Sequence, residues 1–407
     1  MNVVFVEPAF PSNQRQFVRA LAEIGATVIG VGERHVDELD DQLKGWMSHY
    51  HQVPTVVDVG VMTDTVRWIQ GKVWVDRLES TIEAHTMAAA QVREACTIPG
   101  TSVRTAWLCR DKPSMKDALR AAGVPTAASM AAESAAEVHA FAETVGYPLI
   151  LKPRSGAGAL DTTRVDGTAE LDEALGRFGA QGASSIAVEE FVEGHEGFYD
   201  TLSVNGHAEL DFVSHYFPNV LEAMRNRWIS PQFVATNRVD SVDDYQQLRE
   251  MGARVNEALG IGTSATHMEW FFGPKGLRFS EIGCRPPGVG AWDLYSAGND
   301  IDIYREWASA VVNERITTRP SRRFATGIIA LRPERDGQIT GYSGVDDVQA
   351  RMGEWVLDAH LPSPGTPTQQ IEAGYMANAY VRMRHPDYDV LRGMLDDVGR
   401  SVHVHAS

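Results

Sequence analysis

Residues 266–283 constrain the fold of this chain more than any other segment. They form two aromatic-rich runs on either side of a Gly-Pro-Lys-Gly turn, a pattern typical of a β-hairpin. A common form of such a turn has three loop residues, here 274–276, with the glycine in the left-handed conformation. Counted back along both strands, this loop sets Glu269 directly opposite Glu281.

This register places two carboxylates on one face of the hairpin. The three-residue loop pairs Gly273 with Leu277, and like charges directly opposite each other are destabilising, so Glu269 and Glu281 call for a cation. Carboxylate oxygens suit Mg²⁺, which binds through one or two carboxylates together with substrate phosphates. A four-residue loop is the alternative. It shifts the register by one residue and puts the two glutamates on opposite faces.

The composition excludes several classes of protein. The chain has 407 residues, enough for two or three domains, and its content of 43% hydrophobic and 22% charged residues is ordinary for a globular protein. No apolar run approaches the roughly 18 residues that span a membrane, and we expect no signal peptide. A net charge of −17 without a dense Lys/Arg run argues against a nucleic-acid partner. The three cysteines lack metal-binding spacing and fit a reducing cytoplasm.

The order of the expected elements divides the chain into three parts. Residues 1–108 begin with a strand, a helix and a strand, the pattern of a parallel α/β domain. Residues 109–194 alternate short helices and strands, as in a small α+β lobe. Residues 195–407 are rich in hairpins, with a helix at 301–312 and short strands and turns after residue 320. We expect the C-terminal region either to cap a site or to build a homodimer.

A glycine-rich loop between two strands follows Lys152. Its residues Ser155, Gly156, Ala157 and Gly158 are small, which frees backbone N–H groups to surround an anion. The run is not a Walker loop, because no Gly-Lys-Ser/Thr leads into a helix. Such a loop can close as a flap over phosphates, with Lys152 as a positive charge at its base. The alternative is a plain hairpin turn.

Three further segments carry polar groups at the ends of strands or helices. Residues 186–196 end a strand in an acidic turn, whose backbone edge could pair with an adenine and whose Glu196 could accept ribose hydroxyls. Lys112 precedes a helix and could reach a phosphate. Arg285 lies shortly after Glu281, and its planar guanidinium suits a phosphate or a carboxylate. Taken singly, each segment also fits an ordinary solvated turn or ion pair.

Taken together and in this order, the motifs resemble the ATP-grasp superfamily. The shared pattern is a Lys before a helix, a Lys at a glycine-rich flap, Glu-Glu-Phe-Val-Glu-Gly-x-Glu, and a hairpin ending in Glu-Ile-x-x-Arg-Pro. The likeness covers about residues 105–310. It implies an α/β (α+β) fold of the ATP-grasp type, with an N-terminal Rossmann-like domain, a small flap lobe and a larger antiparallel-sheet lobe.

The resemblance implies roles for the matching residues. Lys112 and Lys152 would contact the phosphates of ATP, and the flap would close over them. Glu269 and Glu281 would bind Mg²⁺, with Mn²⁺ as a substitute, and Arg285 would meet the transferred phosphate or the acyl phosphate. The adenine and the ribose would be held by Glu189, Glu190, Phe191, Val192 and Glu196.

The resemblance also implies a reaction. Members typically activate a carboxylate as an acyl phosphate and pass the acyl group to an amine or another nucleophile. The Thr-His-x-Glu at 266–269 and the Arg-Pro-x-Gly at 285–288 look like the L-amino-acid ligases and related carboxylate–amine ligases, in which His267 would face the substrate. The Gln-Val-Glu-like segment of the biotin carboxylases is replaced by Pro-Pro-Gly-Val-Gly. We therefore expect a cytoplasmic, ADP-forming ligase acting on a small carboxylate and an amine.

The chain departs from the family pattern at Gly283. The superfamily often has Asn two residues after the second metal-binding Glu, and glycine offers no side-chain ligand. This departure keeps two alternatives open. One is an acyl-phosphate ligase of the biotin-carboxylase kind, with a non-amine acceptor, and the other is a nucleotide-binding protein that has lost turnover.

Overall fold

The N-terminal part of the chain is a four-stranded parallel sheet in the order β3-β2-β1-β4. The computed structural model describes residues 1–153, 162–180, 185–371 and 375–407. The four strands are β1 (Asn2–Val6), β2 (Thr27–Gly32), β3 (His49–Gln52) and β4 (Arg77–Glu79). The helices are α1 (Gln14–Glu23), α2 (Asp41–Trp46), α3 (Val59–Gln70), α4 (Thr86–Ala95) and the 3₁₀ turns η1 (Val36–Glu38) and η2 (Glu83–His85).

Both faces of this sheet are covered. Val3 and Phe5 pack with Phe17 of α1, whereas Val4 packs with Val66 of α3 on the other face. A strand that is buried on both faces is apolar at every position, which explains the continuous run of β1. The β–α–β start expected from the sequence is therefore confirmed.

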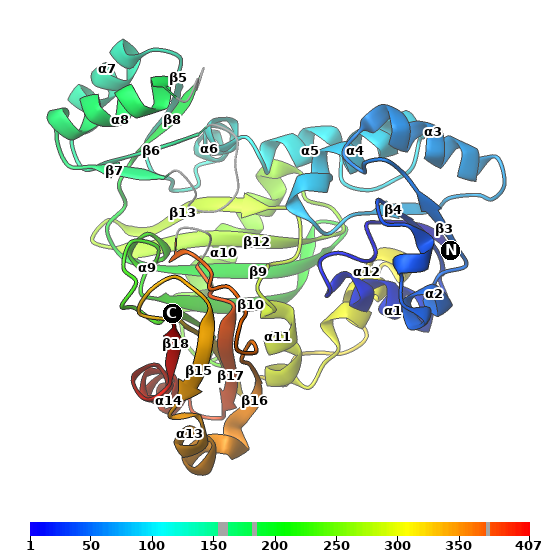
Figure 1. Cartoon of the computed structure of the whole chain (residues 1–407). Helices are drawn as coiled ribbons and strands as arrows, with labels where there is room; N and C mark the ends of the chain where they lie inside the picture. Colours follow the sequence, from blue (N-terminus) through cyan, green and yellow to red (C-terminus); the bar gives the residue numbers. More distant parts are fainter. Residues whose placement is uncertain (154–161, 181–184, 372–374) are drawn as a thin grey trace.

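A small antiparallel sheet, in the order β5-β8-β6-β7, forms a separate lobe at the upper left of Figure 1. Its strands are β5 (Ser129–Ala132), β6 (Leu149–Pro153), β7 (Thr163–Val165) and β8 (Ile186–Glu190). The helices α7 (Ala135–Val145) and α8 (Thr168–Ala180) cover one face. Leu149 and Leu151 of β6 pack against Val138 of α7 and Leu171 of α8, so this lobe has its own core.

An eight-stranded antiparallel sheet forms the centre of the molecule, in the order β13-β12-β9-β10-β11-β14-β17-β16. Its strands are β9 (His195–Val204), β10 (His207–Phe217), β11 (Gln232–Ala235), β12 (Ser264–Gly273), β13 (Gly276–Gly283), β14 (Ala325–Leu331), β16 (Val356–His360) and β17 (Ala379–His385). The mixed α/β architecture expected from the sequence, with a parallel N-terminal sheet, a small lobe and a larger antiparallel sheet, is confirmed.

The C-terminal region differs from the expectation of short strands and turns. Three of its strands extend the central sheet, so it continues the large lobe, and β15 (Ile339–Ser343) pairs with β18 (His403–Ala406) in a separate ribbon. Two helices were missed, α13 (Val345–Met352) and α14 (Tyr388–Ser401). Helix α14 buries Leu391, Leu395 and Val398 at helical spacing, a signal that the sequence already carried.

The hairpin at the edge of the sheet has the expected pairing of Glu269 with Glu281, but its turn is shorter than predicted. Strand β12 ends at Gly273 and β13 begins at Gly276, so two residues form the turn and the prediction of a three-residue loop was wrong. An irregularity between Glu269 and Trp270 restores the register, and Glu269 does lie opposite Glu281. Gly276 has a φ of 74°, the left-handed conformation that was expected. An extra residue on one strand is a β-bulge, which composition alone does not reveal.

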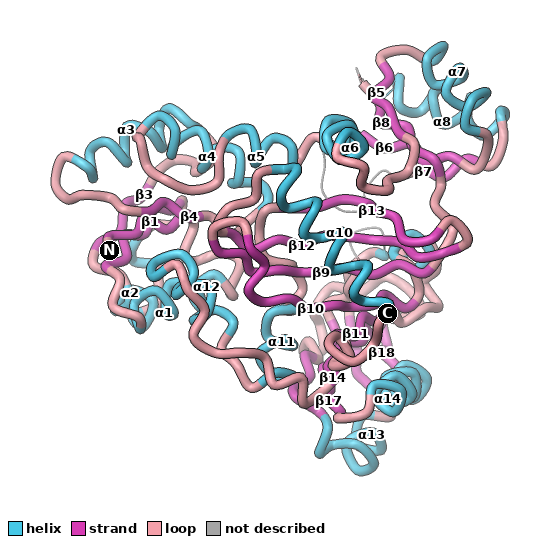
Figure 2. The backbone as a smooth tube through the Cα atoms, turned by 180° about the vertical axis from the view of Figure 1, so that it is seen from behind, coloured by secondary structure: helices cyan, strands magenta, loops and turns pink. Residues whose placement is uncertain are grey.

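Helix α6 (Lys112–Ala121) links the three parts of the fold. Its buried Met115 and Leu119 share a core with Val255 and Leu259 of α10 (Asp244–Leu259), which crosses the face of the central sheet that is turned toward the viewer in Figure 2. The remaining helices are α5 (Val103–Leu108), α9 (Val220–Ala223), α11 (Ala291–Asn299), α12 (Ile303–Asn313) and the 3₁₀ turn η3 (Gly353–Trp355). Within the described ranges, the helices lack the length and apolar character that a membrane span requires.

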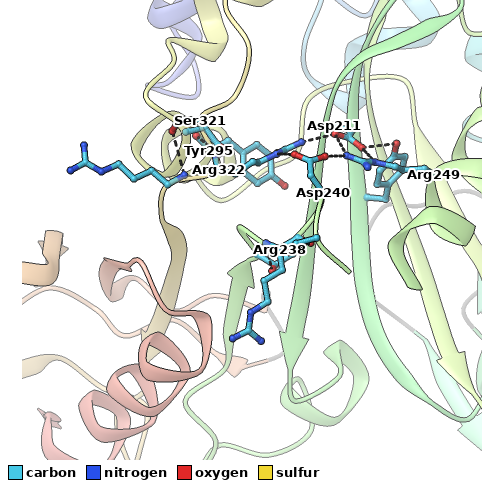
Figure 3. A network of polar contacts seen from close by, with 12 residues as sticks. Asp211, Arg238, Asp240, Arg249, Tyr295, Ser321 and Arg322 are labelled. Atoms are coloured by element: carbon cyan, nitrogen blue, oxygen red, sulfur yellow. Dashed lines mark hydrogen bonds and ion pairs between the residues drawn. The ribbon is translucent and has the colours of Figure 1, made fainter. Parts of the chain in front are cut away.

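A cluster of four charged side chains links strand β10 of the central sheet to helix α10 (Figure 3). Asp211 of β10 accepts hydrogen bonds from Arg249 of α10 at 2.5 Å and from Arg322 at 2.6 Å. Arg322 also lies 3.1 Å from Asp240, which pairs with Arg249 as well. We call these four residues the arginine–aspartate cluster. Two cations face two anions in it, so its charges are balanced within the protein.

Candidate active site

A cavity of about 630 Å³ lies between the small lobe and the central sheet. Its volume is in the range of small-molecule sites. The small lobe contributes Lys152 and Glu189, the hairpin contributes Glu269 and Glu281, and Tyr375 reaches the cavity from the C-terminal region. The hairpin, the small sheet and the C-terminal segment are far apart in sequence, so only the folded chain creates this space.

Buried lysines and glutamates meet at one wall of the cavity. Lys116 lies 2.7 Å and Lys152 lies 2.9 Å from the same oxygen of Glu189, while Lys112 lies 3.3 Å from Glu281. With Glu269, these residues are called the lysine–glutamate cluster: Lys112, Lys116, Lys152, Glu189, Glu269 and Glu281. Its members come from α6, β6, β8 and the hairpin.

Lys116 is the residue that the sequence analysis missed. Its side chain is only 1% exposed, and it lines the cavity beside Lys152, where Lys112 was expected to contact phosphates. Lys112 instead pairs with Glu281. The signal was available, because residues four apart on a helix share one face, and Lys112 and Lys116 of α6 therefore point the same way.

The two lysines and Glu189 shift one another's pKa values. Burial lowers the pKa of Lys116 to about 8, although Glu189 opposes this shift. Burial also disfavours the charge on Lys152, but Glu189 and Glu281 outweigh it and raise the pKa of Lys152. The two lysines overcome burial of Glu189 and lower the pKa of that carboxyl to about 2. Both lysines contact the same oxygen of Glu189, and the expected contact of Glu189 with adenine stays a prediction.

The pKa values of the two opposed carboxylates of the hairpin shift in opposite directions. Burial, followed by the charges of Glu281 and Glu196, raises the pKa of Glu269 to about 8. Desolvation also opposes the charge on the half-buried Glu281, but Lys112 and Lys152 lower its pKa. Two carboxylates forced together in this way fit one divalent cation, which would favour the charged form of both. The described residues hold no group of three or more His, Cys, Asp and Glu side chains placed to bind a metal, so further ligands would come from phosphates or water.

The strand end expected at the adenine and ribose lines the cavity with Glu190, Phe191, Val192 and Glu196. The N–H groups of Glu190 and Phe191 already donate to the carbonyls of Ala128 and Pro148, so neither N–H is available to an adenine. Glu196 accepts a hydrogen bond from the N–H of Val220 at 2.7 Å. Burial raises the pKa of Glu196 to about 7.

His267 is held by a pair of residues that sequence reasoning did not single out. Asp200, on the neighbouring strand β9, lies 2.7 Å from Nδ1 of His267 and accepts a hydrogen bond of 2.5 Å from Tyr295. The other ring nitrogen, Nε2, lies 3.9 Å from Glu269. His267 is therefore fixed beside the hairpin carboxylates, although it is not among the residues that line the large cavity.

Arg285 lies outside the large cavity and lines a smaller polar one. Its Nε is 3.0 Å from Oε2 of Glu83, a residue of η2 in the N-terminal part of the chain. A second nitrogen of Arg285 donates to the carbonyl of Pro286 at 2.9 Å. Glu83 is a further residue that the sequence analysis missed, because no spacing along the chain connects it with Arg285.

The predicted flap residues Ser155, Gly156, Ala157 and Gly158 lie outside the described residues. The strands on either side, β6 and β7, pair antiparallel, with Leu149 opposite Val165.

The comparisons with known proteins agree with this geometry. Residues 117–299 match the family model of the ATP-grasp domain. Residues 117–299 are therefore similar to the ATP-grasp domain. The recognition of this superfamily from ordered motifs is thereby confirmed, and the matched range includes the hairpin, Lys152 and Glu189 but begins one residue after Lys116.

Similar proteins include amino-acid ligases. The L-arginine-specific L-amino acid ligase of Bacillus subtilis is 25% identical over 331 residues, which are 78% of this chain and 76% of that protein. The alanine–anticapsin ligase of Bacillus subtilis is 27% identical over 217 residues, 48% of this chain and 44% of that protein.

Solved structures share the fold of this chain over its whole length. The L-amino acid ligase from Bacillus licheniformis has a TM-score of 0.78 at 17% identity, covering 100% of this chain and 98% of its own. Phosphoribosylglycinamide synthetase from Anaerococcus prevotii has a TM-score of 0.72 at 13% identity, with coverage of 100% and 99%. At these identities the likeness establishes the fold.

Proposed function

We propose that the protein is an ATP-dependent, ADP-forming carboxylate–amine ligase. The observation that carries the proposal is the cavity itself, which joins the lysines around Glu189 to the opposed carboxylates Glu269 and Glu281. The likeness to L-amino-acid ligases supports the same reaction. A carboxylate oxygen would attack the γ-phosphorus of ATP, and ADP would leave. An amine nitrogen would then attack the acyl carbon, phosphate would leave, and the nitrogen would lose a proton.

The lysine–glutamate cluster is proposed to hold the triphosphate. Lys116 and Lys152 would contact phosphate oxygens, while Lys112 keeps Glu281 charged. Glu269 and Glu281 would hold Mg²⁺ or Mn²⁺, which supplies positive charge against the phosphates when bound. Burying like charges together is costly in the free protein, and phosphates and a cation would relieve that cost.

The remaining cavity residues are assigned to the nucleoside and to the flap. We propose that the adenine lies against Phe191 and Val192 and that Glu196 accepts the ribose hydroxyls. Ser155, Gly156, Ala157 and Gly158 are proposed to cover the phosphates and to exclude water, which would otherwise hydrolyse an acyl phosphate.

His267 and Arg285 are proposed to act on the carboxylate that is activated. Arg285 offers a planar cation for the carboxylate and for the acyl phosphate formed from it. Asp200 is a positioning residue, because its contact with Nδ1 leaves Nε2 of His267 turned toward Glu269. In this proposal residues 1–108 and 195–407 enclose the substrates, and residues 109–194 close over the nucleotide.

The proposal is tested by ADP release from the purified protein with ATP and Mg²⁺ over pairs of L-amino acids and small carboxylic acids. We expect release that requires both a carboxylate and an amine, and an amide product of matching mass. Release that requires bicarbonate but no amine would favour a carboxylase. Nucleotide binding without release over every pair would favour a protein that has lost turnover, and either outcome overturns the ligase.

A further inference from the structure

One wall of the large cavity is formed by the connection between β10 and β11. Every residue of 219–226 except Ala223 lines the cavity there, and we call residues 219–226 the α9 wall. Its helix, α9, has four residues, and a helix of one turn is not stable in water by itself. The α9 wall therefore takes its position from contacts with the rest of the chain.

Residues 194–196, at the start of β9, hold the beginning of the α9 wall. The side chain of Asn219 accepts a hydrogen bond from the N–H of Glu196 at 3.1 Å and donates to the carbonyl of Gly194 at 2.8 Å. Glu196 in turn accepts a hydrogen bond from the N–H of Val220 at 2.7 Å. These contacts reach the first two residues of the wall, so they do not fix its end.

Arg332 holds the end of the α9 wall. It follows β14 directly, and its Nη1 donates to the carbonyl of Ala223 and, at 3.3 Å, to the carbonyl of Asn226. The last carbonyls of a helix have no partner within the helix, so a basic side chain stabilises them. Nη2 of Arg332 donates to the carbonyl of Tyr375 at 3.0 Å. One guanidinium group thus joins the wall to a segment of the C-terminal region.

Tyr375 contacts the two strand ends between which the wall lies. Its hydroxyl donates to the carbonyl of Gln232 at 2.7 Å and lies 3.2 Å from the carbonyl oxygen of Pro218. Its ring packs on that of Tyr216 with centroids 5.0 Å apart, and both residues line the large cavity. The C-terminal region therefore contacts the connection near its start and, through Arg332, at the end of the wall.

We propose that Arg332 is a positioning residue for nucleotide binding, because it holds the α9 wall against the large cavity. Arg332 is not among the residues that line the cavity, so it acts through the wall and through Tyr375. The inference rests on the proposed ATP-dependent function. It gives the C-terminal region, which the sequence leaves as a cap or a dimer surface, the role of a cap.

The shape of the guanidinium group matters here as much as its charge. Arginine presents five N–H donors in a rigid planar fork, so two of its nitrogens can serve carbonyls of separate segments. Lysine carries the same charge on one nitrogen at the end of a flexible chain. Arg332→Lys therefore keeps the charge and loses the bridge between Ala223 and Tyr375.

A wall released at its end leaves the cavity incomplete for part of the time. The apparent affinity for a ligand falls with the fraction of molecules in the binding-competent state. Bound nucleotide in turn stabilises the wall, because coupling between two equilibria is reciprocal. Loss of Arg332 should thus weaken nucleotide binding and expose the wall, and nucleotide should reverse the exposure.

The first experiment measures the affinity for a non-hydrolysable ATP analogue with Mg²⁺ by titration calorimetry. We expect Arg332→Lys and Arg332→Gln to raise Kd about 10-fold, and to raise KM for ATP equally while kcat at saturating ATP stays within about twofold. Arg335→Lys is the matched control, because Arg335 also donates to a backbone carbonyl, that of Ala406 in β18 at 2.9 Å. Its Kd should equal that of the wild type.

The second experiment measures how readily the α9 wall opens. Arg225 is an exposed residue of the wall and offers trypsin a cleavage point. Cleavage after Arg225 should be about 10-fold faster in Arg332→Lys than in the wild type, and the ATP analogue should slow it. Denaturant unfolding accompanies the assay, since a general loss of stability would speed cleavage at every site.

Tyr375→Phe tests the same wall with a smaller change. It removes the hydroxyl that contacts Gln232 and Pro218 and keeps the ring, so the fold should be retained. Kd for the ATP analogue should rise about fivefold. If neither Arg332 variant folds, an unchanged Kd in Tyr375→Phe overturns the proposal.

Two results separate the failures. An unchanged Kd in a folded Arg332→Lys protein would overturn the positioning role and leave the ligase intact. A wild type that binds no ATP analogue would overturn the proposed function, whereas faster cleavage after Arg225 in Arg332→Lys would still support the hold of Arg332 on the wall.

Discussion

The lysine–glutamate cluster and the arginine–aspartate cluster each hold equal numbers of cations and anions, but they pair them differently. In the arginine–aspartate cluster, Asp211 faces two guanidinium groups and Asp240 faces the same two, so each charge has partners within the protein. In the lysine–glutamate cluster, two lysines share the single carboxylate of Glu189, and Glu269 lies opposite another carboxylate.

The difference shows which cluster is a site. Where a protein can satisfy its charges, a buried or half-buried network strengthens the fold. In the lysine–glutamate cluster, carboxylates lie together and the pKa values of Glu269 and Lys116 move far from their usual values. We therefore expect a bound ligand to supply the compensating charges. Four experiments break or sharpen this contrast.

The largest effect is expected on catalysis. Glu281→Gln removes one of the two opposed carboxylates with little change in volume, and ADP release should fall by about 10³-fold because the charge of the transferring group is no longer offset. Steady-state kinetics and the affinity for Mn²⁺ with an ATP analogue measure the effect. Asp240→Asn in the arginine–aspartate cluster is the control, and its kcat should stay within about twofold of the wild type. Equal losses in both variants would remove the distinction between the clusters.

The next effect is on stability. Glu189→Gln removes the carboxylate that Lys116 and Lys152 share, and the free energy of unfolding should drop by about 3 kcal/mol. Asp211→Asn removes one carboxylate partner of Arg249 and Arg322, which are partly exposed and still contact Asp240. The free energy of unfolding should therefore drop by only about 1 kcal/mol. Denaturant unfolding measures both values.

Nucleotide offers a further check on the same pair of variants. ATP phosphates are proposed to meet the lysines that Glu189→Gln leaves unpaired, so an ATP analogue should recover part of that loss and none of the loss in Asp211→Asn. Similar recovery in both would contradict the phosphate assignment.

The smallest effect is a pH dependence of opposite sign in the two clusters. The pKa of Glu269 is raised from 4.5 to about 8, so between these values the folded protein keeps a proton that the unfolded chain has lost, and this carboxyl lowers stability as the pH rises. Glu269→Gln should therefore stabilise the substrate-free protein by about 1–2 kcal/mol at pH 8.5, and by almost nothing at pH 4.

Asp240 has the opposite sign. Burial opposes its charge, but Arg249 and Arg322 lower its pKa from 3.8, so it contributes stability at neutral pH and loses that contribution as the pH falls below about 3.8. Asp240→Asn should lower the Tm at pH 7, and this loss should shrink progressively as the pH falls below 3.8. Thermal unfolding scanned over pH measures both variants, and the same sign in both would contradict the assigned shifts.

Much of the site was predictable from local patterns. The β–α–β start and the hairpin follow from periodicity and turn residues, which act over a few residues. The order of the motifs was recognised by its resemblance to the ATP-grasp superfamily. The position of Glu269 opposite Glu281 was also predicted, but the loop is shorter than expected and a bulge compensates for it. The bulge occurs where Phe279 donates to the carbonyl of Pro125, a contact with a distant segment that no local pattern encodes.

Other parts needed the folded chain. Lys116 was within reach of a helical-spacing argument, but its partner Glu189 comes from β8. Asp200 joins His267 only because β9 and β12 are neighbours in the sheet, and Glu83 meets Arg285 only because the N-terminal domain docks through contacts such as that of Phe17 with Trp307, whose ring centroids are 4.9 Å apart.

The sequence by itself determined which chemical groups this protein carries and in which local structures they stand, because hydrogen bonding and side-chain periodicity are short-range. The tertiary structure decided which of these groups share a charge environment. Electrostatic shifts depend on burial and on distances of a few ångströms between segments far apart in the chain, and packing alone sets both. For the same reason only the folded chain shows that Gly283, an apparent gap in the sequence pattern, lies beside Glu83, where an added Cβ would be 3.0 Å from Oε2.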